Sequence, residues 1–548
     1  MTNKINLTMK KLTIGLVAAC IMILVSCNDF LDINEDPNNP TEATLAFLLP
    51  SVQLNMAGAL GASAGGLGEF SSLYTHHTVQ RGVEQNFYAF RGTDFGVQTP
   101  WRLFNTFALK DLEEMLVLAG ERQSGPYLGI GKLMKAYMYA AMVDMYGNLP
   151  YFDAQKGAEE LFPNFDSGED IYPDLIRLID EGIADLEVAS SFTPAADDLI
   201  YNGDLGKWRR FGNTLKLKLY TQIRLVEDVS DEVTALLDEG DLIGPGDDFE
   251  LQYGTSAGPE NRNPAYVQEY APGGARNYVS PYFFEIMRGT NTFFDDNLYQ
   301  GIVDPRIPYY FYNQLPEGAT DDDAENPCSY CPSRSGTPFL SIWMFSFNID
   351  PNEGFDQSSS QTLMGLYPIG GRYDDGSGTP ANFNGVGSTP QRMLTYYARK
   401  YLEAELAVTG VINADDRALF EEAVRASFDK VDELAAAGGA PPLDMEAVDT
   451  NYIEKVLALY DAADEEGKLE HIMTQKWIAT FGFGVDAYTD YRRTGYPKLH
   501  DPSTDNLNVT ESNRSYPLAY PYPNTEITRN PNAPDQRNIA SDGVFWDK

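Results

Sequence analysis

Three consecutive segments in the first half of the chain carry apolar side chains at intervals of three and four residues. They occupy residues 127–146, 167–186 and 207–226, and Gly147-Asn148-Leu149-Pro150 ends the first of them. This period places the apolar side chains on one face of an α-helix. Amphipathic helices in succession are typical of helical hairpin arrays, although the strict tetratricopeptide consensus is not met. We therefore predict a mostly α fold built on a tetratricopeptide-like helical hairpin array.

The middle of the chain differs in character. Residues 227–394 are rich in Gly, Pro, Asn, Asp and Tyr and show no sustained periodicity. A structureless loop of this length would be unusual in a compact domain. We interpret the segment as a large, irregular, loop-rich insert with short helices and strands, packed against the N-terminal helical part at residues 45–226. Functional surfaces concentrate on such loops, so we predict that the insert binds the ligand.

The helical period returns after the insert. The segments that show it are residues 393–408, 416–437, 452–462 and 467–481. We assign residues 395–548 to a C-terminal helical part and an extended, proline-rich tail that runs over the surface. The three parts together form one intertwined domain.

The N-terminus predicts export. Lys4, Lys10 and Lys11 precede an apolar run at residues 12–25, which is too short to cross a bilayer as a mature helix. The sequence Leu24-Val25-Ser26-Cys27 that ends it looks like a bacterial lipobox. We predict a signal peptide at residues 1–26, lipidation of Cys27 and a tether at residues 27–44. The alternative is an ordinary cleaved signal with a chance cysteine, but no small-x-small cleavage site follows Cys27.

The charge of the chain excludes some partners. There are 40 Lys and Arg against 80 Asp and Glu, which gives a formal net charge of −40. Such a field repels phosphate backbones and anionic lipid surfaces, so we expect no nucleic-acid partner and no membrane contact beyond the anchor. We interpret the excess of acid as a solubility device for a surface protein.

The cysteines cannot form a disulfide framework. Of the four, Cys20 lies in the signal peptide and Cys27 is the predicted anchor, which leaves Cys328 and Cys331. In an oxidising compartment this pair favours a local disulfide that rigidifies a loop around Tyr330. A metal site would need two further ligands, so we predict no metal ion.

Motifs for catalysis are weak. Residues 61–65 fit a G-x-S-x-G nucleophile elbow, but no strand signal precedes them. The four histidines do not occur at H-E-x-x-H spacing, and no phosphate-binding glycine loop is present. Acidic residues are too numerous for a glycosidase pair to be chosen by sequence. We predict no catalytic residue and no cofactor.

Aromatic side chains among turn residues are the best candidates for a ligand site, because flat rings stack on the apolar faces of sugars. Those in the insert are Tyr330, Trp343, Tyr367 and Tyr373, and Arg372 and Asp374 are their polar partners. The alternative is that Trp343 and Tyr367 pack the core of the insert itself.

Several separated segments resemble one known family. Residues 207–217 read K-W-R-R-F-G-N-T-L-K-L, and residues 144–151 fit D-x-x-G-x-x-P-Y. Further matching segments are residues 34–40, 304–306, 402–407, 475–479, 491–497 and 522–526. Because these segments occur in the same order as in that family, the chain resembles the SusD/RagB-type outer-membrane nutrient-binding lipoproteins. Within the family it resembles the second SusD-like branch. It departs from the family at Phe545-Trp546-Asp547, where a Trp-Trp-Asp is expected, and at the two late cysteines.

The resemblance implies a function. It implies a lipoprotein of the outer membrane, facing the extracellular side, that binds an oligosaccharide or, second, a peptide and acts as the lid of a SusC-like TonB-dependent transporter. It also implies structural roles for most motif residues: Arg492, Arg493 and Glu405 pair or cap at helix ends, while Trp208 and Trp477 belong to the core. The alternatives are a surface glycan hydrolase and a helical scaffold for an outer-membrane complex.

Overall fold

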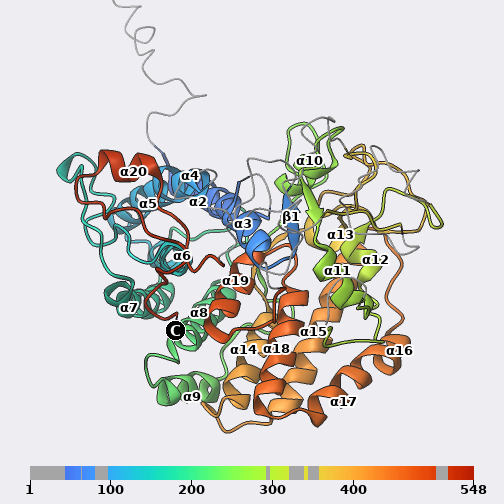
Figure 1. The fold of residues 1–548 in the computed structure, drawn as a ribbon. Coiled ribbons are helices and arrows are strands. Elements are labelled where there is room, and N and C mark those ends of the chain that lie inside the picture. The colour runs from blue at the N-terminus through green and yellow to red at the C-terminus, as the bar shows by residue number, and fades with distance from the viewer. Residues whose placement is uncertain are drawn as a thin grey trace, which may run out of the picture.

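The computed structural model describes residues 43–62, 65–80, 97–291, 296–319, 338–342, 357–500 and 516–547. Most of them are helical (Figure 1), as the sequence predicts. Among the described residues, no helix is both long and apolar enough to cross a membrane.

The N-terminal part consists of helices that pack in chain order. They are α2 (Leu45–Leu60), α3 (Leu67–Tyr74), α4 (Gln98–Arg102), the π-helical η3 (Leu103–Ala108), α5 (Leu109–Glu121), α6 (Gly125–Tyr146), the short 3-10 turn η4 (Gly157–Glu159), α7 (Gly168–Leu186) and α8 (Leu205–Ile223). Helix α6 packs against α5 and α7, and α7 packs against α8. The three helices predicted from the periodicity are confirmed.

Local sequence explains where these helices begin and how closely they approach. The Ser167 hydroxyl accepts a hydrogen bond from the backbone N–H of Asp170 at 3.1 Å and so caps α7. Helices α6 and α7 meet at two glycines. A Cβ atom on Gly129 would lie 2.6 Å from the carbonyl oxygen of Gly182, so only glycine permits this approach.

Short elements connect the two helical parts. The helices are α9 (Ser230–Glu239), α10 (Pro264–Tyr270), α11 (Pro281–Arg288), α12 (Ile307–Tyr310) and α13 (Leu366–Ile369). The strands are β1 (Thr78–Gln80), β2 (Phe249–Leu251), β3 (Asn277–Val279), β4 (Phe311–Tyr312), β5 (Leu363–Met364) and β6 (Gln391–Leu394). They form three antiparallel pairs, β1–β3, β2–β6 and β4–β5. Pairing of β1 with β3 joins the N-terminal part to the middle of the chain.

The C-terminal part is a second group of helices. Its elements are α14 (Tyr396–Val408), α15 (Asp416–Ala437), α16 (Met445–Val448), the π-helical η6 (Asp449–Ile453), α17 (Glu454–Ala462), α18 (Glu465–Ala479), α19 (Gly484–Thr494) and α20 (Asn524–Arg529). The predicted helix at residues 416–437 is confirmed. The predicted start at Met393 is wrong, because Met393 belongs to β6 and Thr395 caps α14 through its hydroxyl.

The tail does not simply run over the surface, and that prediction is wrong. Tyr520, Tyr522 and Trp546 are buried, with Trp546 fully inaccessible to solvent. The indole Nε1–H of Trp546 donates to Asp144 on α6 at 2.9 Å. Short α20 follows Tyr522 and lies beside α4 (Figure 1). The last residues are therefore part of the N-terminal helical core, because aromatic burial outweighs the extended path that proline favours.

The structural roles predicted for the motif residues are confirmed. Trp208 and Trp477 are fully or almost fully buried. Arg493 forms an ion pair with Glu405, both without exposed side-chain surface, and Arg493 also contacts Asp490 at 2.7 Å. Arg492 donates to the carbonyl oxygen of Leu518 at 2.8 Å. These charges hold α14, α19 and the tail together.

Candidate ligand-binding site

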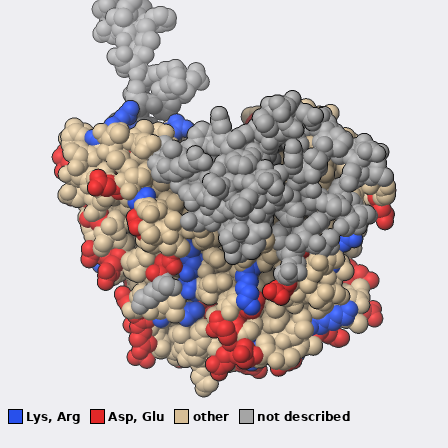
Figure 2. All heavy atoms as spheres, viewed as in Figure 1, with Lys and Arg blue, Asp and Glu red and all other residues tan. Residues whose placement is uncertain are grey.

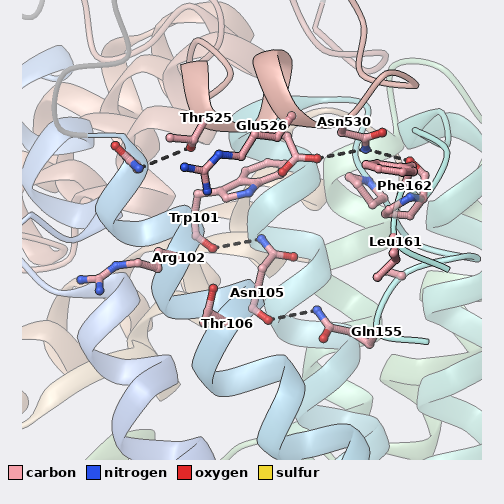
Figure 3. Close-up of a pocket in the computed structure, with 15 residues that line it drawn as sticks. Trp101, Arg102, Asn105, Thr106, Gln155, Leu161, Phe162, Thr525, Glu526 and Asn530 are labelled. Carbon is pink, nitrogen blue, oxygen red and sulfur yellow. Dashed lines mark hydrogen bonds between the residues drawn. The ribbon is translucent and has the colours of Figure 1, made fainter. Parts of the chain in front are cut away.

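A pocket of about 460 Å³ opens between α4, η3, the segment at residues 150–163 and α20 (Figure 3). Its wall combines apolar and aromatic, amide-bearing and charged side chains. The apolar residues are Trp101, Leu161 and Phe162, the amide residues include Asn105, Gln155 and Asn530, and the charged residues are Arg102, Glu526 and Arg529. Three separate parts of the chain therefore build one site.

Trp101 forms the rigid part of the wall. Its side chain is only 7% exposed. The indole stacks on Phe165 with ring centroids 6.4 Å apart and meets Tyr146 edge-to-face at 5.1 Å. Such packing fixes the ring before any ligand arrives.

Hydrogen bonds hold the other walls to this helix. The Asn105 amide donates to the Trp101 carbonyl oxygen at 3.0 Å, and the Gln155 amide donates to the Asn105 carbonyl oxygen at 3.1 Å, as Figure 3 shows. Gln155 has a backbone φ of 62°, in the left-handed region. The bond to Asn105 supports that strained conformation and fixes the loop against η3.

Helix α20 closes the opposite side. The Asn530 amide donates to the carbonyl oxygen of Pro163 at 2.9 Å and to Glu526 at 3.1 Å. The Gln98 amide donates to the hydroxyl of Thr525 at 3.3 Å. The tail is thus attached both to the loop at residues 150–163 and to α4.

The pocket also offers apolar surface to solvent. Phe162 is 46% exposed and Leu161 is 68% exposed. Both stand on the loop at residues 150–163, on the side of the pocket opposite Arg102 (Figure 3). A ligand with an apolar face can therefore pack on Phe162 while its polar groups reach the amides.

The sequence-predicted ligand residues lie elsewhere. Tyr330 and Trp343 lie outside the described residues, as do Cys27, Cys328 and Cys331. Tyr367 is fully buried: it stacks on Tyr310 with centroids 4.6 Å apart, and its hydroxyl donates to the Ala479 carbonyl oxygen at 2.7 Å. No face of its ring is open to a ligand in this conformation, so Tyr367 is a core residue, the alternative to a ligand role.

Arg372, Tyr373 and Asp374 are brought together on one partly exposed segment. The Arg372 guanidinium lies over the Tyr312 ring at 4.7 Å, and the Tyr373 ring meets Tyr309 edge-to-face at 5.0 Å. Asp374 accepts a hydrogen bond from the Asn313 amide at 2.6 Å, and burial raises the pKa of its carboxyl group. These contacts fix the segment on α12 and β4, and a ligand role for it stays a prediction.

Sequence reasoning missed the pocket. Trp101 and Asn105 lie one helical turn apart, an aromatic and an amide on one face, and that spacing is the signal that was available. The other walls come from residues 150–163 and 525–530. No local sequence pattern predicts that these segments lie next to Trp101.

Catalytic arrangements find little support in the described part of the chain. The Gly61–Gly65 motif follows helix α2 rather than a strand, which is the wrong setting for a nucleophile elbow. No group of three or more His, Cys, Asp or Glu side chains among the described residues could hold a metal ion. The pocket is lined by a single carboxylate, Glu526.

Comparison with known proteins identifies the fold. Solved structures with the same fold include a chitin-binding protein (TM-score 0.66, 20% identity, 92% of this chain and 100% of that one covered). A SusD/RagB family protein from Bacteroides thetaiotaomicron gives a TM-score of 0.67 at 20% identity, with 92% and 99% covered. A SusD homologue from Bacteroides uniformis gives 0.63 at 21% identity, with 92% and 99% covered. A search of curated proteins finds no match.

The family model covers most of the chain. The model SusD-like_2, described as "Starch-binding associating with outer membrane", matches residues 37–523. This range includes the helices on both sides of the insert and all but the last part of the pocket wall. The chain therefore belongs to the SusD-like family of nutrient-binding proteins associated with the outer membrane.

Proposed function

We propose that this protein is a cell-surface lipoprotein that binds an oligosaccharide in the Trp101 pocket and delivers it, as a lid, to a SusC-like TonB-dependent transporter. Family membership supports nutrient binding at the outer membrane. The lipobox-like sequence ending at Cys27 supports a lipid anchor. Several acyl chains would attach the protein firmly, since each buried methylene contributes about 0.8 kcal/mol.

The observation that carries the proposal is the composition of the pocket. A volume of about 460 Å³ falls within the range typical of small-ligand sites. Sugars present an apolar C–H face and a rim of hydroxyl groups, so they need an aromatic surface and fixed hydrogen-bonding groups. Phe162 and Trp101 supply the first, and Asn105 and Gln155 supply the second.

The position of the pocket supports delivery toward the membrane. Helix α2 contacts both α4 and η3, and α2, α4 and α20 lie together at one end of the molecule in Figure 1. The proposed anchor precedes α2 in the chain. A ligand in the pocket would therefore lie at the end of the protein that the proposed lipid anchor holds at the membrane.

The same pocket favours binding over hydrolysis. Most glycoside hydrolases place two carboxyl groups across the scissile bond, about 5 to 9.5 Å apart. Among the residues that line the pocket, Glu526 alone has a carboxyl group. We therefore propose that the protein releases its ligand unchanged.

The test is isothermal titration calorimetry of the mature chain with Cys27→Ser against a panel of oligosaccharides and peptides. We expect an oligosaccharide to bind. Phe162→Ala should raise the Kd for this oligosaccharide by about tenfold or more, while Tyr373→Ala should leave the Kd unchanged. Binding that depends on Tyr373 and not on Phe162 would move the site to the insert. Release of shorter sugars from the bound ligand would make the protein an enzyme.

The partner and the anchor need separate measurements. Solubilised membranes of cells that make the full chain should yield a large outer-membrane barrel protein together with it. Mass spectrometry of the native N-terminus should find acyl chains on Cys27, and an unmodified cysteine there would contradict the lipoprotein assignment.

A further inference from the structure

Most Lys and Arg side chains in the described part of the chain form ion pairs with acids, while exposed Lys110, Arg122 and Lys455 form none there. On the exposed surface, Arg177 contacts Asp174 at 2.7 Å and also pairs with Glu181. Arg417 contacts Glu421 at 3.0 Å and Asp461 at 2.9 Å. Arg209 likewise contacts Glu187 at 3.1 Å and Asp241 at 2.6 Å. Acids outnumber bases by 80 to 40, so carboxylates are the commonest partners of the basic side chains that are paired.

The two arginines of the pocket belong to the exposed cations that form no ion pair in the described part of the chain. Arg102 on α4 and Arg529 on α20 are both exposed and both line it. Within the described part of the chain, neither forms a hydrogen bond or an ion pair through its guanidinium. The Arg102 guanidinium lies over the Phe107 ring, 5.6 Å from its centroid.

The one carboxylate of the pocket does not neutralise these arginines. Glu526 accepts a hydrogen bond from the Asn530 amide at 3.1 Å. It lies in no ion pair with either arginine among the described residues. The lining of the pocket therefore carries an excess of positive charge inside a protein whose formal net charge is −40.

The two cations come together only in the folded chain. Arg102 and Arg529 belong to helices at opposite ends of the sequence, and the docking of α20 onto α4 through Gln98 and Thr525 places them around one cavity. Acidic side chains gather toward the lower edge of the face shown in Figure 2, with basic ones above them, away from α4 and α20 in Figure 1. Salt screens charges beyond a Debye length of about 8 Å, so the local arginines dominate what a bound ligand experiences.

We infer that the pocket selects an acidic oligosaccharide, one that bears carboxylate or sulfate groups, and this inference rests on the proposed function. A guanidinium matches the geometry of a carboxylate or a sulfate with two parallel hydrogen bonds. The ligand supplies the counter-charge that the protein surface itself does not.

The amides favour a sugar over an acidic peptide. Asn105 and Gln155 donate through their amide nitrogens to backbone carbonyls, and their side-chain oxygens can accept from other donors. Hydroxyl groups are such donors, and a sugar carries several on each ring. Phe162 then takes the apolar face of the same ring.

Calorimetry with a matched pair of ligands tests the inference. An oligogalacturonate and its fully methyl-esterified form have the same backbone and differ in charge; a sulfated oligosaccharide, a neutral maltooligosaccharide and an acidic peptide complete the set. We expect the mature chain to bind the oligogalacturonate or the sulfated sugar about tenfold or more tightly than the ester or the neutral sugar. Which of the two acidic sugars binds better identifies the acidic group.

Substitutions test whether Arg102 and Arg529 cause the preference for acidic sugars. Arg102→Gln and Arg529→Gln should each reduce the preference for the acidic sugar, and the double variant should abolish it. Lys455→Gln, on α17 and away from the pocket, removes one exposed positive charge and should leave the preference unchanged. Because all three side chains are exposed, the fold should tolerate each change.

The outcomes separate the inference from the proposed function. Affinity for both acidic sugars no higher than for the ester and the neutral sugar would overturn the inference and leave sugar binding intact. An acidic preference that survives the double variant would do the same. Tighter binding of the acidic peptide than of any sugar would overturn the choice of ligand class. Failure of every sugar to bind would remove the proposed function itself.

Discussion

The indole nitrogen of Trp546 donates a hydrogen bond to the carboxylate of Asp144, which lies 402 residues earlier in the chain, at 2.9 Å. Tyr172 donates to the same oxygen at 2.5 Å, and the backbone carbonyl of Asp144 accepts from Arg492. Burial raises the pKa of the Asp144 carboxyl group. One buried acid therefore joins α6, α7, α19 and the end of the tail.

Removing the indole donor should destabilise the protein. Trp546→Phe keeps an aromatic ring but deprives buried Asp144 of a hydrogen bond, which costs about 2 kcal/mol in the free energy of unfolding. Urea denaturation, monitored by circular dichroism, measures this loss in the free energy of unfolding. The neighbouring change Phe545→Leu, at a half-buried ring, should cost less than about 1.5 kcal/mol. Equal costs for the two variants would show that the hydrogen bond to Asp144 contributes nothing.

The buried ion pair between Glu405 and Arg493 gives a second prediction. Glu405→Gln removes the negative charge that Arg493 and Arg224 share, and it should cost about 3 kcal/mol of stability. The matched change Asp461→Asn breaks an exposed pair with Arg417 and should cost less than about 1 kcal/mol. Thermal unfolding gives the Tm of each variant. Equal Tm values for Glu405→Gln and Asp461→Asn would argue against a structural role for the buried pair.

The contact between α6 and α7 can be tested with glycines. Gly129→Ala places a Cβ atom 2.6 Å from the carbonyl oxygen of Gly182, so the helices must separate, at a cost of about 1 to 3 kcal/mol. Gly120→Ala on α5 meets nothing within 4 Å and should stabilise the protein by about 0.5 kcal/mol. The two substitutions are chemically identical. We expect urea denaturation to show changes of opposite sign in the free energy of unfolding. A neutral Gly129→Ala variant would contradict the close approach.

Buried histidines predict loss of stability in acid. Burial lowers the pKa of His77 from about 6.5 to about 3, and its ring stacks on Trp477 with centroids 5.0 Å apart. Since the unfolded chain takes up the proton first, the contribution of His77 is complete above pH 6.5 and is lost as the pH falls toward 3.

The variant His77→Phe keeps an aromatic ring and removes this titration. Between pH 6.5 and 3, its free energy of unfolding should fall less steeply than that of the wild type, by up to about 1.4 kcal/mol per pH unit. A slope remains, because His76 and His471 are also buried and their pKa values are also lowered. Parallel pH profiles for the two proteins would show that His77 does not titrate on unfolding.

The regular helices could be predicted from sequence because their signals are local. Helix α15 spans Asp416–Ala437, the range that its apolar period gives. The start of α14 was misplaced because Leu394 pairs with Phe249 in β6 and β2, a contact far apart in the chain. The burial of Trp546 depends in the same way on Asp144.

The site could not be predicted for the same physical reason. Trp101, Gln155 and Arg529 meet only after the tail docks on the N-terminal helices, and each alone is an ordinary helical or loop residue. Aromatics among turn residues led instead to the insert, where Tyr367 proves to be a core residue. Composition indicates that a ligand surface exists, while tertiary packing decides where it lies.

The most direct test of the central claim is a crystal structure of the mature protein with the oligosaccharide that binds best in calorimetry. The account predicts electron density for the sugar between α4, η3 and α20, with one ring packed on Phe162 and hydroxyl groups at Asn105 and Gln155. Density on the segment at Arg372 to Asp374, with the Trp101 pocket empty, would contradict it.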